Sequence, residues 1–71
     1  MECMAGYKAK WTKTNAANEV IRICQDTHHA WFVERQKDRD QHLNPLGGFS
    51  TLDFAKLWAD DHYPGGEWEQ V

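Results

Sequence analysis

The N-terminal part of the chain alternates between apolar and polar residues over positions 7–14. Tyr7, Ala9 and Trp11 fall on one side of an extended chain, and four polar residues fall on the other: Lys8, Lys10, Thr12 and Thr14. A period of two with aromatic and β-branched residues predicts a half-buried β-strand. The polar tetrapeptide at 15–18 predicts the turn that follows this strand.

Residues 19–35 fit two different structures. Two apolar runs, at 20–24 and 31–33, are separated by the polar stretch 26–29. As strands, residues 20–25 and 30–35 form a hairpin across this loop. As one helix, the apolar positions recur every three or four residues, with Asn15 as the N-cap. The β-branched and aromatic content favours the hairpin, which also gives the first strand a partner.

The clearest helical pattern lies at 51–62, where four residues follow the spacing i, i+3, i+4, i+7: Phe54, Leu57, Trp58 and Asp61. This spacing predicts an apolar stripe of about two turns that packs against the sheet. Ser50 is placed to be the N-cap, with Asp53 as a variant of the capping-box partner, and residues 64–66 end the helix. Beyond the helix, Trp68 stands among acidic residues and either docks back on the sheet or is an exposed contact point.

These elements predict a single small α+β domain over residues 1–71, a three-stranded antiparallel sheet with one C-terminal helix packed on one face. We expect a flexible N-terminus at 1–6, a mobile loop at 36–48 and an acidic tail at 64–71. Hydrophobic residues make up 41% of the chain and aromatic residues 13%, which is typical of a folding chain. The length of 71 residues excludes a multi-domain enzyme. No apolar run approaches the ~20 residues of a membrane helix, so we expect no membrane partner.

The chain contains two cysteines, Cys3 and Cys24. Secreted domains of this size usually carry more. We therefore expect a reducing compartment, the cytoplasm of a bacterial host cell, with Cys24 as a free core residue and Cys3 as a free thiol. A disulfide between the two cysteines is the alternative.

Charge is unevenly distributed along the chain. Residues 1–39 hold seven of the eight Lys and Arg side chains and five of the eleven Asp and Glu side chains, a net +2. Residues 40–71 hold one cationic and six acidic side chains, a net −5. The overall charge of −3 is not the basic balance typical of nucleic-acid-binding domains. It is also too small for a DNA mimic, but such an uneven field directs the choice of partner.

Two groups of residues are candidate binding sites. The first is acidic and includes one tryptophan: Asp60, Asp61, Glu67, Trp68 and Glu69. Negative charge is unfavourable at the C-terminal end of a helix, so we expect these carboxylates to meet a protein partner with a basic surface, with Trp68 as the apolar anchor. The second is a Lys-rich strand face that can follow the phosphate backbone of a nucleic acid: Lys8, Lys10, Lys13, Arg22 and Arg35.

Candidate catalytic or metal chemistry is sparse. The chain has four histidines: His28, His29, His42 and His62. They lack the doubled, closely spaced ligand pairs of structural zinc sites, and Cys24 with His28 has i, i+4 spacing on one face only in the helical alternative. No Gly-rich phosphate loop, G-x-S-x-G or H-E-x-x-H motif occurs. We expect no catalytic residues, no metal and no cofactor, and a protein that is not an enzyme.

Residues 48–51 (GFST) lead into residues 54–59 (FAKLWA), after the aromatic strand at 30–35 (AWFVER). With the order strand, strand, strand, helix, residues 7–63 resemble the short sheet-plus-helix proteins of phages and prophages, and the arm-type DNA-binding domains of phage integrases. The resemblance implies the α+β fold and an origin on a mobile element. Arm-type domains are usually basic on the sheet and across its loops, whereas this chain carries Glu19, Asp26 and Glu34 in those parts and has an acidic helix.

We therefore expect a non-enzymatic protein-interaction module of a phage or mobile element, which acts by occupying the surface of a partner. One form of this role is an inhibitor of a host nucleic-acid-binding defence complex, similar in style to anti-CRISPR proteins. The first alternative is a small DNA-binding or recombination accessory domain that uses the Lys-rich strand face. The second is a structural subunit of a homo-oligomer such as a homodimer.

Overall fold

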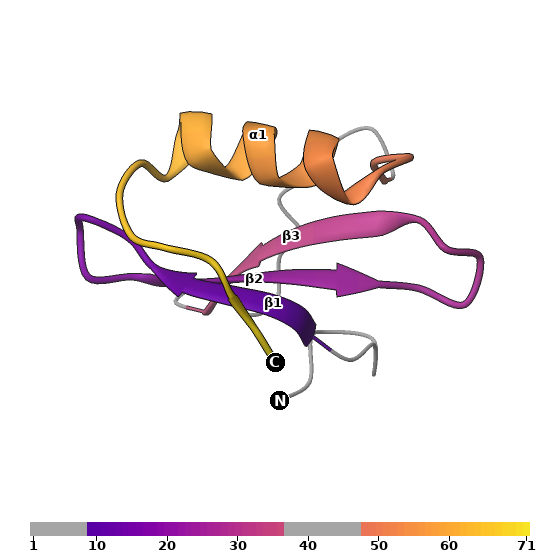
Figure 1. Cartoon of the computed structure of the whole chain (residues 1–71), viewed down its shortest axis with the longest axis horizontal. Coiled ribbons are helices and arrows are strands. Elements are labelled where there is room, and N and C mark those ends of the chain that lie inside the picture. Colours follow the sequence, from indigo (N-terminus) through magenta and orange to yellow (C-terminus); the bar gives the residue numbers. More distant parts are fainter. Residues whose placement is uncertain (1–8, 37–47) are drawn as a thin grey trace.

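The structure, a computed structural model, describes residues 9–36 and 48–71 of the chain. Within these residues, four strands form one antiparallel sheet in the order β3-β2-β1-β4, and a helix lies along one side of it (Figure 1). The elements are β1 (Ala9–Thr14), β2 (Val20–Gln25), β3 (Trp31–Arg35), α1 (Leu52–His62) and β4 (Glu69–Gln70). The prediction of a small single-domain α+β fold with an antiparallel sheet and one helix is confirmed.

Residues 19–35 form the β2–β3 hairpin and not the alternative helix. Ile23 of β2 lies opposite Val33 of β3, and the neighbouring pair is Cys24 and Phe32. Because adjacent residues of a strand point to opposite sides, Ile23 and Val33 share one side of the sheet and Cys24 and Phe32 share the other. Asp26 closes the connecting loop, because its Oδ1 accepts hydrogen bonds from the backbone N–H groups of His28 and Ala30 at 2.8 and 2.9 Å.

β1 differs in its orientation from the simple alternation that the sequence predicts. Ala9 lies opposite Cys24 and Trp11 lies opposite Ile23, so the register shifts by one residue between Ala9 and Trp11. Because adjacent residues of β2 point to opposite sides of the sheet, Ala9 and Trp11 lie on opposite sides, where the pattern put them together. Lys13 shares the side of Trp11.

The core lies between α1 and the sheet. Ala55 and Ala59 of α1 are fully buried and belong to one apolar cluster with Ile21, Ile23 and Val33. Alanine has the smallest side chain that a helix can bury without the cost of glycine, so the helix backbone approaches the strands closely along this stripe.

Two large apolar side chains of α1 lie away from this core, whereas Leu52 and Trp58 are partly buried against it. Phe54 is 57% exposed and Leu57 is 69% exposed, whereas the predicted stripe placed both against the sheet. The prediction is wrong for these two residues, because a second stripe with helical spacing, Leu52, Ala55 and Ala59, meets the sheet. Trp58 of the predicted stripe is partly buried against the core.

α1 begins one residue later than the sequence predicts. The N-cap is Thr51 and not Ser50, and the Oγ1 atom of Thr51 accepts a hydrogen bond from the N–H of Phe54 at 3.2 Å. Asp53 therefore lies in the first turn, where its charge favours the helix dipole, but it is not the third helical residue that a capping box requires.

The segment 64–71, predicted as an acidic tail, adds a fourth strand to the expected three. β4 pairs with β1, and the N–H of Val71 donates to the carbonyl oxygen of Lys10 at 2.9 Å. Gly66 has a φ of 83° and lies so close to Thr14 that a Cβ atom would overlap the Thr14 carbonyl oxygen. Glycine at this position therefore lets the segment pass close to the end of β1.

Several expectations fall outside the described residues: the flexible segment 1–6, all but the ends of the loop 36–48, and the side chains of Cys3, Tyr7, Lys8 and His42. Cys24 is fully buried and disulfide-bonded, so the expectation of a free Cys24 is wrong. None of the helical structure in residues 9–36 and 48–71 has the length and apolarity that crossing a membrane requires.

Candidate interaction surface

The outer surface of α1 carries exposed apolar residues beside a carboxylate. Phe54, Leu57, Trp58 and Asp61 line a shallow pocket of about 370 Å³. Trp58 is half-buried, and 83% of the Asp61 side chain is exposed. Contiguous exposed apolar side chains on a small protein commonly mark an interaction site. We call these four residues the helix patch.

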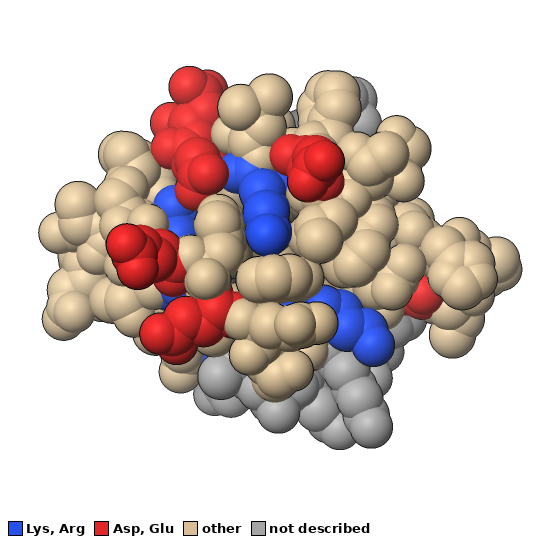
Figure 2. Space-filling model, in the orientation of Figure 1, with Lys and Arg blue, Asp and Glu red and all other residues tan. Residues whose placement is uncertain are grey.

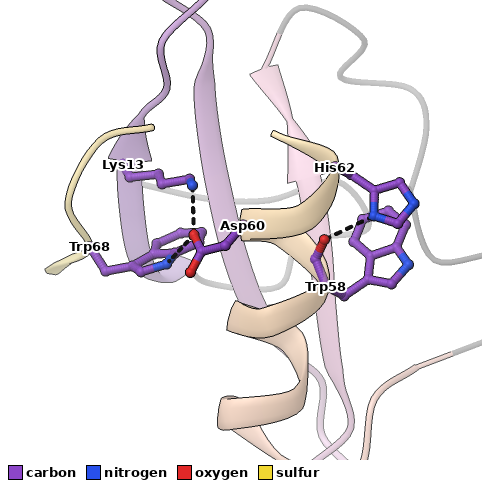
Figure 3. A network of polar contacts seen from close by, with 5 residues as sticks. All are labelled: Lys13, Trp58, Asp60, His62 and Trp68. Carbon is purple, nitrogen blue, oxygen red and sulfur yellow. Dashed lines mark hydrogen bonds and ion pairs between the residues drawn. The ribbon is translucent and has the colours of Figure 1, made fainter. Parts of the chain in front are cut away.

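Aromatic contacts support the helix patch from beneath and from its C-terminal end. The ring of Phe49 stacks on Phe54 with centroids 5.6 Å apart and lies 5.7 Å from the ring of Trp58. The His62 ring stacks on Trp58 at 3.9 Å, and its Nδ1–H donates to the Trp58 carbonyl oxygen at 2.9 Å (Figure 3). These contacts fix the Trp58 ring, so the patch is formed before any partner arrives.

Tyr63 follows α1 and packs edge-on against Trp58, with ring centroids 6.3 Å apart. Burial raises the pKa of the Tyr63 phenol above its ordinary value of 10.0; the Arg35 guanidinium opposes this rise, and the carboxylate of Glu19 adds to it. Tyr63 is therefore neutral at physiological pH, and Asp61 supplies the charge of the helix patch.

The acidic residues predicted as one site have different surroundings. Asp60 Oδ1 accepts hydrogen bonds from Lys13 Nζ at 2.6 Å and from Trp68 Nε1 at 3.0 Å (Figure 3). Lys13 is buried, and its Nζ lies 5.0 Å from the centre of the Trp68 ring. Asp60 and Trp68 therefore join α1, β1 and the C-terminal segment. Of the two alternatives for Trp68, the structure has the one in which the side chain docks back on the fold.

The remaining carboxylates of the predicted site are exposed. Asp61 belongs to the helix patch, whereas Glu67 and Glu69 line a second hollow of about 300 Å³ with Thr12, Lys13 and Thr14. Figure 2 shows acidic side chains gathered around the end of the molecule where α1 turns into the C-terminal segment. Of the carboxylates in the predicted site, Asp61 is the one that lines the pocket with Phe54, Leu57 and Trp58.

Among the residues that the structure describes, the basic side chains proposed to contact a phosphate backbone do not share one exposed surface. Three of them form ion pairs: Lys13 with Asp60, Arg22 with Glu34 at 2.8 Å and Arg35 with Glu19 at 3.1 Å. Lys13 and Arg22 are buried. Lys10 is exposed, and Lys8 lies outside the described residues. The four described residues of this group therefore do not form one charged face.

The three described histidines lie in two separate places. His28 and His29 are exposed in the β2–β3 loop, and His62 ends α1. Among residues 9–36 and 48–71, no group of three or more His, Cys, Asp or Glu side chains is placed to hold a metal ion.

Phe54 and Leu57 were not predicted as surface residues, because large apolar side chains at helical spacing are usually core residues. The signal that could have found them is the competing stripe of Leu52, Ala55 and Ala59. A helix can bury only one of two such stripes against a single sheet face, so the other stripe is left to solvent.

Comparisons of the chain with protein-family models, with curated proteins and with solved structures give no match.

Proposed function

We propose that this protein is a non-enzymatic protein-interaction module of a phage or other mobile element, and that it acts by occupying the surface of a partner protein. The observation that carries the proposal is the exposure of Phe54 and Leu57 on α1. Complete burial of such a side chain contributes about 1.5–3 kcal/mol. A small domain needs its apolar residues for its own core, so folding alone does not explain why these two face solvent.

The charge around the helix patch supports a basic partner. Asp61 lines the patch, and Asp53 is exposed beside Phe54 at the N-terminal end of α1. A chain with a net charge of −3 is attracted to cationic surfaces, such as those with which nucleic-acid-binding complexes hold phosphates. The specific form that we propose is an inhibitor of a host nucleic-acid-binding defence complex, in the manner of anti-CRISPR proteins.

This form of the proposal includes a location in the cytoplasm of the bacterial host. The disulfide of Cys24 argues against that location, because disulfides persist mainly in oxidising compartments. The affinity capture that tests the proposal is therefore run with and without a reductant, which cleaves this disulfide.

The two alternative functions are a DNA-binding accessory domain and a structural subunit of a homo-oligomer. The ion pairs of Lys13, Arg22 and Arg35 favour a protein partner over DNA, because a cation that is already paired with a carboxylate gains little from a phosphate.

The proposal is tested by affinity capture from bacterial lysate with the wild type, Leu57→Ser and Val71→Ser. Val71 is the matched control, since it is also an exposed apolar residue (58%) but lies in the C-terminal segment. We expect a partner that the wild type and Val71→Ser retain and that Leu57→Ser loses by about tenfold. Nucleic-acid binding by the captured complex is then measured with each variant, and the wild type should inhibit it.

Other outcomes favour the alternatives. Direct binding to DNA that falls steeply with salt and weakens in Lys10→Glu indicates the accessory domain. Self-association at micromolar concentration in sedimentation experiments indicates the homo-oligomer. Equal capture by the wild type and Leu57→Ser contradicts the use of the helix patch.

A further inference from the structure

We infer that the helix patch takes an arginine side chain, presented between apolar residues of the partner protein. This inference rests on the proposed function and specifies the chemistry of its partner.

The pocket combines the two surfaces that an arginine side chain contacts best. Phe54, Leu57 and Trp58 supply an apolar floor, and Asp61 supplies a carboxylate at its rim. An arginine has an aliphatic stem that packs on apolar surface. Its planar guanidinium stacks on aromatic rings and pairs with a carboxylate through two parallel hydrogen bonds. A lysine ammonium is a compact, strongly hydrated charge and forms neither contact as well.

The carboxylate of Asp61 is available for such a pair. His62 Nδ1 lies 3.9 Å from Asp61 Oδ2, too far for a hydrogen bond, and donates to the Trp58 carbonyl oxygen instead. The lysine of α1, Lys56, is directed elsewhere, with its Nζ 3.6 Å from the ring centre of Trp11. A cation from the partner would therefore meet a carboxylate that is 83% exposed and whose basic neighbour among residues 9–36 and 48–71 is His62 at 3.9 Å.

Charge also favours an arginine over a second copy of the chain as the occupant of the helix patch. Asp53 and Asp61 lie four residues before and after Leu57, so they flank Leu57 along the exposed side of α1. A symmetric contact between two copies centred on Leu57 would bring aspartates of one copy against aspartates of the other, in either helix direction. Like charges at an interface are unfavourable. An anionic lipid or phosphate surface is repelled for the same reason.

The inference is tested by nuclear magnetic resonance titration of the ¹⁵N-labelled full chain with short peptides. The probes are acetyl-Ala-Leu-Arg-Leu-Ala-amide and two analogues in which lysine or the neutral isostere citrulline replaces the arginine. Titrations extend to about 10 mM, because a contact of this size is expected to bind in the millimolar range. The indole N–H signal of Trp58 and the amide signals of Leu57 and Asp61 report occupation of the patch.

We expect the arginine peptide to shift these three signals and the lysine and citrulline peptides to bind about three- to tenfold more weakly. Asp61→Asn should weaken the binding of the arginine peptide by a similar factor. Glu67→Gln makes the same change of charge outside the patch, and it should change the affinity for the arginine peptide by less than about twofold.

Equal binding of the arginine and citrulline peptides, equal binding of the arginine and lysine peptides, or no effect of Asp61→Asn would overturn the arginine inference. So would shifts confined to residues outside the patch, or no shift with any peptide. These results leave the proposed function to its own test, because capture that depends on Leu57 requires the apolar surface and does not require arginine.

Discussion

Asp60 and Asp61 are neighbours in the chain, but only Asp60 is tied to the rest of the fold. Its carboxylate accepts from Lys13 Nζ and Trp68 Nε1, whereas Asp61 is exposed at the helix patch. The difference arises from Lys13, because a charged donor removed from water needs an acceptor. Asp60 therefore stabilises the fold, and Asp61 remains available for binding.

Asp60→Asn is expected to lower the free energy of unfolding by about 1–3 kcal/mol, since it leaves the buried ammonium of Lys13 without its carboxylate. Asp61→Asn is the matched control, and it should leave stability unchanged or raise it by up to about 1 kcal/mol, because it removes negative charge from the C-terminal end of α1. Urea denaturation of both variants measures the difference. Equal effects would mean that the ion pair with Lys13 does not stabilise the fold.

At the level of elements, the strands could be predicted better than the faces they present. The β2–β3 hairpin follows from its β-branched and aromatic content. The face of Trp11 could not be predicted, because a register shift between Ala9 and Trp11 leaves no mark in the alternation. Likewise, helical spacing located α1 but did not decide between its two apolar stripes, since that choice depends on how closely the helix approaches the sheet.

The orientation of α1 is tested by substitutions on its two stripes. Ala59→Leu is expected to destabilise the domain by about 1–3 kcal/mol, because it adds volume to a packed core. Leu57→Ala should change stability by less than about 0.5 kcal/mol, since Leu57 is 69% exposed and leucine and alanine are both good helix formers. Thermal or urea unfolding measures both. A larger loss in Leu57→Ala than in Ala59→Leu would show that the helix packs through the stripe predicted from sequence.

At the scale of the whole molecule, contacts between residues far apart in the chain decide which acidic residues of the candidate site are free to bind a partner. The acidic residues are close in sequence, but Asp60 and Trp68 pair with each other and with Lys13 from the first strand. A sequence pattern shows which charges are present and does not show which of them pair across the fold. The acidic end of the chain was therefore predicted as one surface, while the structure assigns part of it to holding the C-terminal segment in place.

The C-terminal segment is expected to be a local unit of low stability, because β4 has two exposed residues and few contacts are lost when it detaches. Gly66→Ala should detach it, since alanine is strained at a φ of 83° and its Cβ would overlap the Thr14 carbonyl oxygen. Hydrogen exchange should then speed up about tenfold or more at the amide of Val71, which donates to Lys10, and at that of Ala16, which donates to Pro64. The amides of β2 should change much less.

Trp68→Phe is a milder variant for the same measurement, because it keeps an aromatic ring and removes only the Nε1–H bond to Asp60. It should speed up exchange at the same two amides by a smaller factor, in line with the loss of one hydrogen bond to a charged group. The contrary result is a uniform increase in both variants that extends to the amides of β2. In that case the C-terminal segment opens only when the whole domain unfolds, and β4 contributes to global stability as the central strands do.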